Sequence, residues 1–160
     1  MKQLKVKRTF TRGIAEAEAY IYEKVKLTAA QNSLASEAEI EADLGRFDKA
    51  TEEVSADLER LSEESAIFAG HLSIANDIAF RETVISKIKD EKQNVELAVE
   101  NTIQEFSAMM AAIDDAYMQE RAADILDVGE RFMFALQGVE LSGLDHIKKP
   151  VIIVAEDLTP

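Results

Sequence analysis

The sequence predicts a mainly α-helical protein: an antiparallel bundle of two helical hairpins, inserted between short strands of an incomplete α/β subdomain. The chain has only 2 prolines and 6 glycines in 160 residues, and it is rich in Ala, Glu, Leu and Lys, which favours helix. Apolar residues recur at spacings of three and four through its middle. β-Branched and aromatic residues gather at its two ends, where strands are expected.

The first long helix is expected to begin near Ser36 and to run for about 25–30 residues, roughly 40 Å. Ser36 and Glu39 fit a capping box, although Ser33 could equally start the helix. Its apolar stripe consists of Leu44, Phe47, Val54, Leu58 and Leu61. Thr51 stands where the stripe calls for another apolar residue. A helix of this length needs a partner helix to cover its stripe.

A shorter, kinked helix is expected next, in ESAIFAGHLSIAND at 64–77 and on through IAFRETVISKIKDE, either as one bent helix or as two. Nothing charged lies between Glu64 and Asp77. Two adjacent faces are apolar: Ile67, His71, Ile74 and Ile78 on one, and Phe68, Leu72, Ala75 and Ala79 on the other. Gly70 costs a helix about 1 kcal/mol relative to alanine, which indicates close approach by a neighbour. The pattern favours a partner-binding surface, although a lone helical histidine is more often structural than catalytic.

Two further long helices form the second hairpin. The first starts at about Asn94 and carries Val95, Val99, Ile103, Phe106, Met110 and Ile113 on one stripe. Asp114 and Asp115 break this series and supply an N-cap for the next helix. That helix carries Met118, Ala122, Ile125, Val128, Phe132 and Leu136, and Gly138 is its natural C-cap.

Short strands are expected at both ends, in QLKVKRTF, in EAYIYEKVKL and in the run Val151–Val154. The last run is β-branched and bounded by Pro150 and Asp157, which is typical of a buried strand. We expect three parts: an edge of the α/β subdomain at 1–24, the helical subdomain at 25–142 and a return strand at 143–160. The chain stops at Pro160, directly after a strand, so the α/β subdomain is expected to be cut short.

The charge pattern argues against several partners. The net charge is −13, and because the first twelve residues carry +5, the other 148 carry −18. Such a charge opposes nucleic acid and anionic membranes and attracts a basic partner. The longest apolar stretches fall short of the ~18 residues of a membrane span, and no secretory signal is present. Without cysteine there is no disulfide or thiolate metal site, and we expect a cytoplasmic protein.

Motifs that would mark an enzyme are missing from the chain. It has no G-x-S-x-G elbow, no phosphate-binding glycine loop and no H-E-x-x-H. A di-metal bundle would show Glu-x-x-His pairs, but Phe68 precedes His71 by three residues and Gly143 precedes His146. The many acidic residues fit solvated helix faces. We therefore expect no catalytic residue, metal site or cofactor in this chain.

One segment is familiar. AAIDDAYMQERAADILDVGERFM, residues 111–133, resembles the D-x-Y-x-x-E-R-A-A-D-x-x-D-x-G-x-R segment of enzyme I of the bacterial phosphotransferase system. That family passes phosphate from phosphoenolpyruvate to a protein carrier at the start of sugar uptake. AIFAGHLSIAND, RGIAEAEAYIYE and PVIIVAEDLTP resemble three other blocks of the family in order and spacing. The opening block departs from the family pattern, with Arg12 in place of proline before Gly13.

The resemblance implies that the helical subdomain docks HPr, the family's small phosphocarrier, beside an α/β subdomain that carries a phosphohistidine. The carrier-binding residues it implies are Ala66, His71, Ile74, Ala75, Asp77, Phe80, Met110, Ile113, Met118 and Arg121. The family's phosphohistidine motif, and its barrel for phosphoenolpyruvate and magnesium, are expected beyond Pro160. This chain alone is thus expected to be inactive, and a longer parent to need magnesium and to dimerise through its carboxy-terminal domain. The alternative is a non-catalytic interaction or scaffold module that kept the fold; a metal-dependent bundle enzyme lacks ligands.

Overall fold

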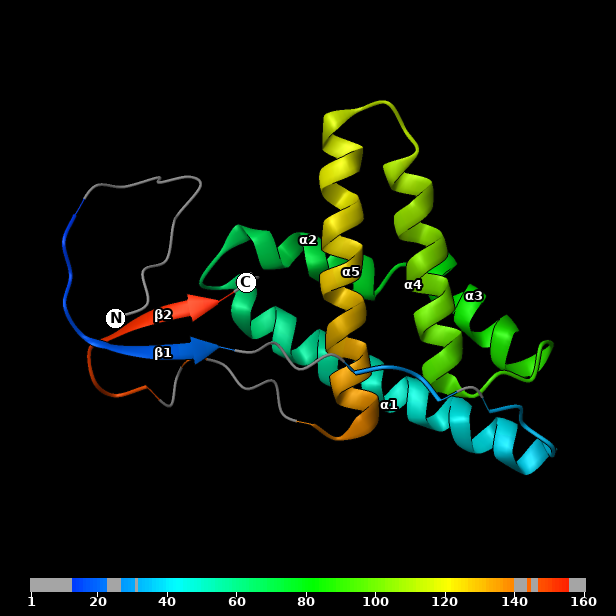
Figure 1. Ribbon diagram of the computed structural model, residues 1–160. Coiled ribbons are helices and arrows are strands. Elements are labelled where there is room, and N and C mark those ends of the chain that lie inside the picture. Colours follow the sequence, from blue (N-terminus) through cyan, green and yellow to red (C-terminus); the bar gives the residue numbers. More distant parts are fainter. Residues whose placement is uncertain (1–12, 23–26, 31, 140–143, 145–146, 156–160) are drawn as a thin grey trace. The chain divides into compact units, whose positions relative to one another are not determined.

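A computed structural model of the chain describes residues 13–22, 27–30, 32–139, 144 and 147–155 (Figure 1). The chain divides into two compact units, one of residues Lys26–Leu141 and the other of Met1–Val25 with Ser142–Pro160. The first unit is helical and the second contains the strands. The strand expected at 3–10 and His146 lie outside the described residues.

Among the described residues, the helical unit has five helices: α1 (Glu37–Ser62), α2 (Ala66–Ala75), α3 (Ile78–Lys89), α4 (Val95–Ala111) and α5 (Ala116–Gln137). The expected kinked helix is two helices, α2 and α3, because Asp77 starts a new one: its carboxylate accepts from the Phe80 amide at 2.9 Å. Figure 1 shows α4 and α5 side by side, crossing α1. The predicted fold, a mainly helical bundle between short strands, is confirmed. None of the described helices is long and apolar enough to cross a membrane.

Local caps set the ends of the long helices. The Ser36 hydroxyl accepts from the Glu39 amide at 3.3 Å, and the Glu39 carboxylate accepts from the Ser36 amide at 3.0 Å. This is the predicted capping box, so α1 begins after Ser36 and not after Ser33. Asp115 caps α5 by accepting from the Met118 amide at 3.0 Å, and Gly138 ends it in the left-handed conformation, with φ of 63°.

Phenylalanine rings join the two hairpins in one core. Phe47, Phe80 and Phe132 are buried, and the Phe132 ring lies 5.9 Å from that of Phe47 and 5.6 Å from that of Phe80, centroid to centroid. Thr51, the polar member of the α1 stripe, is also buried. Its hydroxyl donates to the Phe47 carbonyl at 2.8 Å, so its polar group is satisfied within the helix.

The start of α4 is held by a side chain from α1. The buried Asp43 carboxylate accepts from the Val95 amide at 2.8 Å, whereas the side chain of Asn94, the residue at the N-cap position, makes no capping bond. Arg46 pairs with Asp43 at 3.0 Å and also with Glu96. This network therefore ties α1 to the first turn of α4, where backbone N–H groups lack partners within the helix.

The two ends of the helical unit lie next to each other. The Gln137 side chain, at the end of α5, donates to the Thr28 carbonyl at 3.4 Å, ahead of α1. Between Thr28 and α1, Ser33 forms a bridge with Gln93 in the loop before α4. A unit that begins and ends at one place can be inserted between two neighbouring strands.

The second unit holds a pair of parallel strands, β1 (Glu18–Tyr22) and β2 (Val151–Ala155), with Glu18 opposite Val151. The prediction that the second strand is buried is wrong. Ile152, Ile153 and Val154 are each 37% exposed, and Ile21 is 70% exposed. The reason is that the described residues of this unit include only these two strands and no helix to cover them.

Candidate functional site

The helix α2 carries no Asp, Glu, Lys or Arg side chain, and much of its surface is covered by neighbours. His71 and Ala75 are buried, and the Phe68 ring meets the His71 ring edge-on, with 5.9 Å between centroids. The helix packs against both α1 and α5. Part of the uncharged run at 64–77 is therefore core, as an apolar face of a bundle helix must be.

Arg121 of α5 fills the seam between α2 and α5. A Cβ built on Gly70 would lie 3.1 Å from Arg121 Nη1, so the close approach predicted at Gly70 is present. The Arg121 guanidinium also lies over the Tyr117 ring, 5.6 Å from its centroid, a cation–π arrangement. Asp124 Oδ2 is 3.7 Å from Arg121 Nη1, and Asp124 Oδ1 is 3.5 Å from His71 Nε2.

A second arginine fixes the other part of the same seam. Arg131 lies over the Phe68 ring at 5.5 Å and pairs with Asp57 of α1 at 2.8 Å. Asp57 in turn pairs with Arg60 at 2.7 Å. Since Arg131 belongs to α5 and Phe68 to α2, these contacts tie three helices together. This part of the site positions α2.

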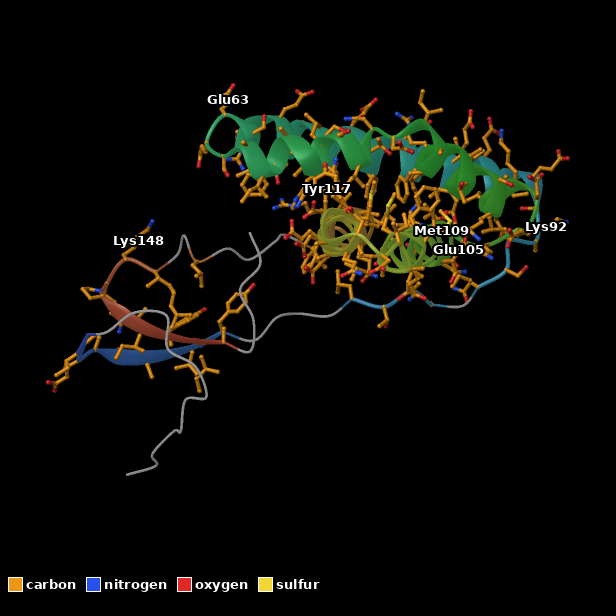
Figure 2. All side chains as sticks on the ribbon, turned by 90° about the horizontal axis from the view of Figure 1, so that it is seen from above. Glu63, Lys92, Glu105, Met109, Tyr117 and Lys148 are labelled. Carbon is orange, nitrogen blue, oxygen red and sulfur yellow. The ribbon has the colours of Figure 1, made fainter. Side chains whose placement is uncertain are left out.

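The turn between α4 and α5 is flanked by exposed apolar side chains. The described residues contain no group of three or more His, Cys, Asp or Glu side chains that could hold a metal ion. Tyr117, whose ring lies under the Arg121 guanidinium, is 60% exposed, and Met109 near the end of α4 is 58% exposed. Both lie close to the turn between α4 and α5, and Figure 2 labels Tyr117 on the α5 side of the hairpin and Met109 on the α4 side. Such a surface can bind another protein.

Residues 9–121 match the family described as PEP-utilising enzyme, N-terminal. The chain belongs to this family. Among curated relatives named phosphoenolpyruvate-protein phosphotransferase, those of Geobacillus stearothermophilus and Bacillus subtilis (strain 168) are 41% and 38% identical over 157 residues. Each alignment covers 92% of this chain and 27% of the relative, so the chain spans about a quarter of their length. The resemblance predicted from the sequence is confirmed.

Solved structures agree with the match to the PEP-utilising family. A solution NMR structure of an Enzyme I (nEIt) protein is 31% identical, with a TM-score of 0.77 over 90% of this chain and 61% of that chain. The N-terminal domain of Enzyme 1 - Nitrogen is 25% identical, with a TM-score of 0.67 over 89% of this chain and 61% of that chain.

Three of the carrier-binding residues that the family resemblance implied are core residues in this structure. His71 and Phe80 are each 1% exposed and Ala75 is 0% exposed. Their side chains do not reach the surface, and we leave them out of the candidate contact surface. The family resemblance gave the position of each residue along its helix. The side of the helix that is buried depends on how α2 and α3 pack, which the resemblance did not give.

The other implied residues are at least partly exposed. Ile74, Met110, Met118 and Arg121 are half-buried, and Ala66, Asp77 and Ile113 are exposed. The structure gathers Met110, Ile113, Met118 and Arg121 around the turn between α4 and α5, and it brings Arg121 against α2 at Gly70. Asp77 also has a structural task, because its carboxylate caps α3.

Sequence reasoning did not include four exposed apolar side chains among the site residues: Ile67, Ile78, Met109 and Tyr117. For Ile67 and Ile78 a signal was present, because both lie on an apolar face of the expected kinked helix. That face also contained His71, which is buried. The helical wheel fails beyond Asn76, because the chain breaks there between α2 and α3.

Proposed function

We propose that this chain is the carrier-docking region of a phosphoenolpyruvate–protein phosphotransferase, and that its partner is the phosphocarrier HPr. The single observation that carries the proposal is the set of exposed apolar side chains on α2, at the start of α3 and near the α4–α5 turn, in a chain of the PEP-utilising family. We call this the docking surface. It comprises Ala66, Ile67, Ile74, Asp77, Ile78, Met109, Met110, Ile113, Tyr117, Met118 and Arg121.

The chemistry of the docking surface suits a partner that is bound briefly. Methionine and isoleucine side chains offer an adaptable apolar contact, and Arg121 and Tyr117 are of the residue types that most often dominate binding energy. Phosphate transfer requires only that two histidines meet for a short time. We expect a small-to-standard interface and roughly micromolar affinity, about −8 kcal/mol.

Electrostatic steering is the second part of the proposal. The chain beyond its first twelve residues carries −18, which attracts a basic carrier from a distance. Raising the salt concentration should therefore slow association more than it speeds dissociation, since steering acts over more than a Debye length. Stopped-flow mixing at several salt concentrations measures both rates. Salt-independent association would contradict steering by acidic residues.

The phosphoryl chemistry is proposed for a longer parent. The sequence contains no G-G-x-T-S-H motif for a phosphohistidine, so the 160-residue chain should bind carrier without taking phosphate from phosphoenolpyruvate and magnesium. Acid-labile phosphate on this chain under those conditions would contradict this. A cytoplasmic location, a magnesium requirement of the parent and its dimerisation through a carboxy-terminal domain belong to the same proposal.

The experiment that tests docking is an NMR titration. Isotope-labelled chain is mixed with unlabelled HPr, and amide shifts are expected at residues 66–78 and 109–121. Tyr117→Lys should weaken binding about tenfold, because it replaces an exposed aromatic ring beside Arg121 with a strongly hydrated charge. Leu126→Lys is the matched control. Leu126 is 50% exposed, and it lies on the opposite side of α5 from Tyr117, because the two are nine residues apart.

The outcomes separate the two functions considered. Shifts confined to the docking surface, with Tyr117→Lys weakened and Leu126→Lys unchanged, support carrier docking. Saturating HPr without shifts would contradict docking and favour a non-catalytic helical scaffold. Equal weakening by both variants would show that net charge, and not the docking surface, decides the affinity.

A further inference from the structure

The buried imidazole of His71 lacks hydrogen bonds. The residue is 1% exposed, and neither Nδ1 nor Nε2 has a hydrogen-bond partner among the described residues. A buried polar atom without a partner costs about 1–3 kcal/mol, and native proteins keep few of them. The histidine therefore calls for an explanation beyond packing, which an apolar side chain of similar size would provide without this cost.

The nearest charged group, Asp124, stands between two possible partners. Its Oδ1 is 3.5 Å from His71 Nε2 and its Oδ2 is 3.7 Å from Arg121 Nη1. Charge-assisted N–H···O bonds are about 2.7–2.9 Å long, so Asp124 is just outside bonding distance of both. Each of its two oxygens faces one partner, and a displacement of the carboxylate toward α2 shortens the contact with His71 and draws it away from Arg121.

The remaining charges at this seam are already paired with one another. Apart from His71, α2 carries no charged side chain. From α5, Arg131 lies over the Phe68 ring, and from α1 its partner Asp57 is shared with Arg60. Asp124 is therefore an anion 3.5 Å from His71, and Arg121 is a cation 3.7 Å from the same carboxylate.

We propose that Asp124 is a positioning residue that exchanges between Arg121 and protonated His71, so that a proton on His71 releases Arg121 and weakens carrier docking. The proposal rests on the proposed function. A buried imidazolium must be paired, which draws Asp124 toward α2. Arg121 then lacks its carboxylate, keeps only Tyr117, and presents an uncompensated positive charge to a basic carrier.

The first test uses the free chain and needs no partner. The Arg121 side-chain Nε–H signal is followed by NMR as the pH is lowered from about pH 7.5 to about pH 5.5. We expect the Arg121 signal to move with pH in the wild type and in His146→Gln, which removes the other histidine. It should stay fixed in His71→Gln and in Asp124→Asn, which keeps the histidine but removes the competing charge.

The second test measures HPr affinity at both pH values. Titrating groups of HPr change the affinity for wild type and for His71→Gln equally. The difference in affinity loss between the two chains therefore reports on His71 alone. We expect wild type to lose about fivefold more affinity on acidification than His71→Gln, at the low end of couplings between sites. An equal loss in both chains would overturn the link to docking.

These outcomes keep the two proposals apart. An Arg121 signal that follows pH in His71→Gln as it does in the wild type overturns the exchange of Asp124, whatever the carrier does. If the Arg121 signal depends on His71 and Asp124 but HPr binds at neither pH, the exchange stands and carrier docking fails.

Discussion

Two glycines within helices show that the effect of a residue on stability depends on its neighbours. A Cβ on Gly129 of α5 would lie 2.7 Å from Ile103 Cγ2 of α4, whereas a Cβ on the exposed Gly45 of α1 would meet nothing within 4 Å. Either glycine costs its helix about 1 kcal/mol relative to alanine. At Gly129 the missing side chain permits the close approach of α4 and α5. At Gly45 no neighbour requires a glycine.

Alanine should therefore have opposite effects at the two positions. Gly129→Ala should lower the free energy of unfolding by about 1–3 kcal/mol, because the β-branched Ile103 has little freedom to move away. Gly45→Ala should raise it by about 0.5–1 kcal/mol, through helix propensity and a less flexible unfolded chain. Urea denaturation of both variants measures this. A Gly129→Ala protein as stable as Gly45→Ala would contradict the tight packing of α4 on α5.

Sequence alone could not distinguish these two glycines, since both lie in stretches with a clear helical pattern. Gly70 was singled out because it stands in an unusual uncharged run, and its neighbour proved to be Arg121. The partial exposure of Arg121 and the burial of His71 depend on how α2 lies against α5. No local pattern contains that information.

Among the elements, α4 begins in an unusual way, because its capping carboxylate comes from another helix. Asp43→Ala should lower the free energy of unfolding by about 2 kcal/mol, since it leaves the buried Val95 amide without a partner. Asp48→Ala is the matched control on α1: this exposed residue pairs with Arg81 at 3.4 Å, and its loss should cost at most about 0.5 kcal/mol. Equal losses in urea denaturation would show that the Val95 contact adds no stability.

The start of α1 predicts a dependence on pH. The backbone N–H groups of Ala35 and Ser36 donate to the Glu39 carboxylate and hold its pKa below the ordinary value. A carboxyl with a lowered pKa in the folded state contributes stability at neutral pH that is lost as the pH falls through that lowered value. The stability difference between wild type and Glu39→Gln should therefore shrink between about pH 6 and pH 3.

Thermal unfolding of both proteins across this range measures the difference. Glu41→Gln, exposed on the same helix but outside the capping box, serves as the control. The difference between Glu41→Gln and wild type should change less with pH. A constant difference for Glu39→Gln would indicate that the Glu39 carboxylate bonds equally well in the unfolded chain.

The element boundaries that sequence predicted are those whose causes are local. Ser36 with Glu39, Asp115 with Met118, and Gly138 all act within a few residues, so the chain itself displays them. The Asp43–Val95 contact joins residues 52 positions apart and could not be foreseen. The separation of α2 from α3 was left open because the apolar pattern continues across Asp77.

At the scale of the whole molecule, the two units differ in how completely they bury apolar side chains. The helical unit has a continuous core, while the isoleucines of β1 and β2 remain partly in solvent. A pair of strands is at best marginally stable without further layers. In this 160-residue chain, amides of residues 18–22 and 151–155 should exchange with solvent far faster than those of α4 and α5.

Hydrogen–deuterium exchange followed by NMR measures both units in one sample. The helical core supplies the internal reference, because its amides should exchange only through global opening. Protection of the strands equal to that of α5 would mean that the strand pair is covered in solution. Sequence indicated strands at both ends of the chain, but their burial was overestimated, because a β-branched run does not reveal whether its neighbours are present.

The parallel pairing of Glu18 with Val151 has a consequence for folding kinetics. The entire helical unit lies between the two strands, and closing so long a loop carries an entropic cost that the strands alone cannot offset. Once the helical unit has folded, Gln137 meets Thr28, so far fewer residues remain to be closed between the two strands. Strand pairing should therefore be the late kinetic phase, so a variant that slows assembly of α4 and α5 should delay the strands equally.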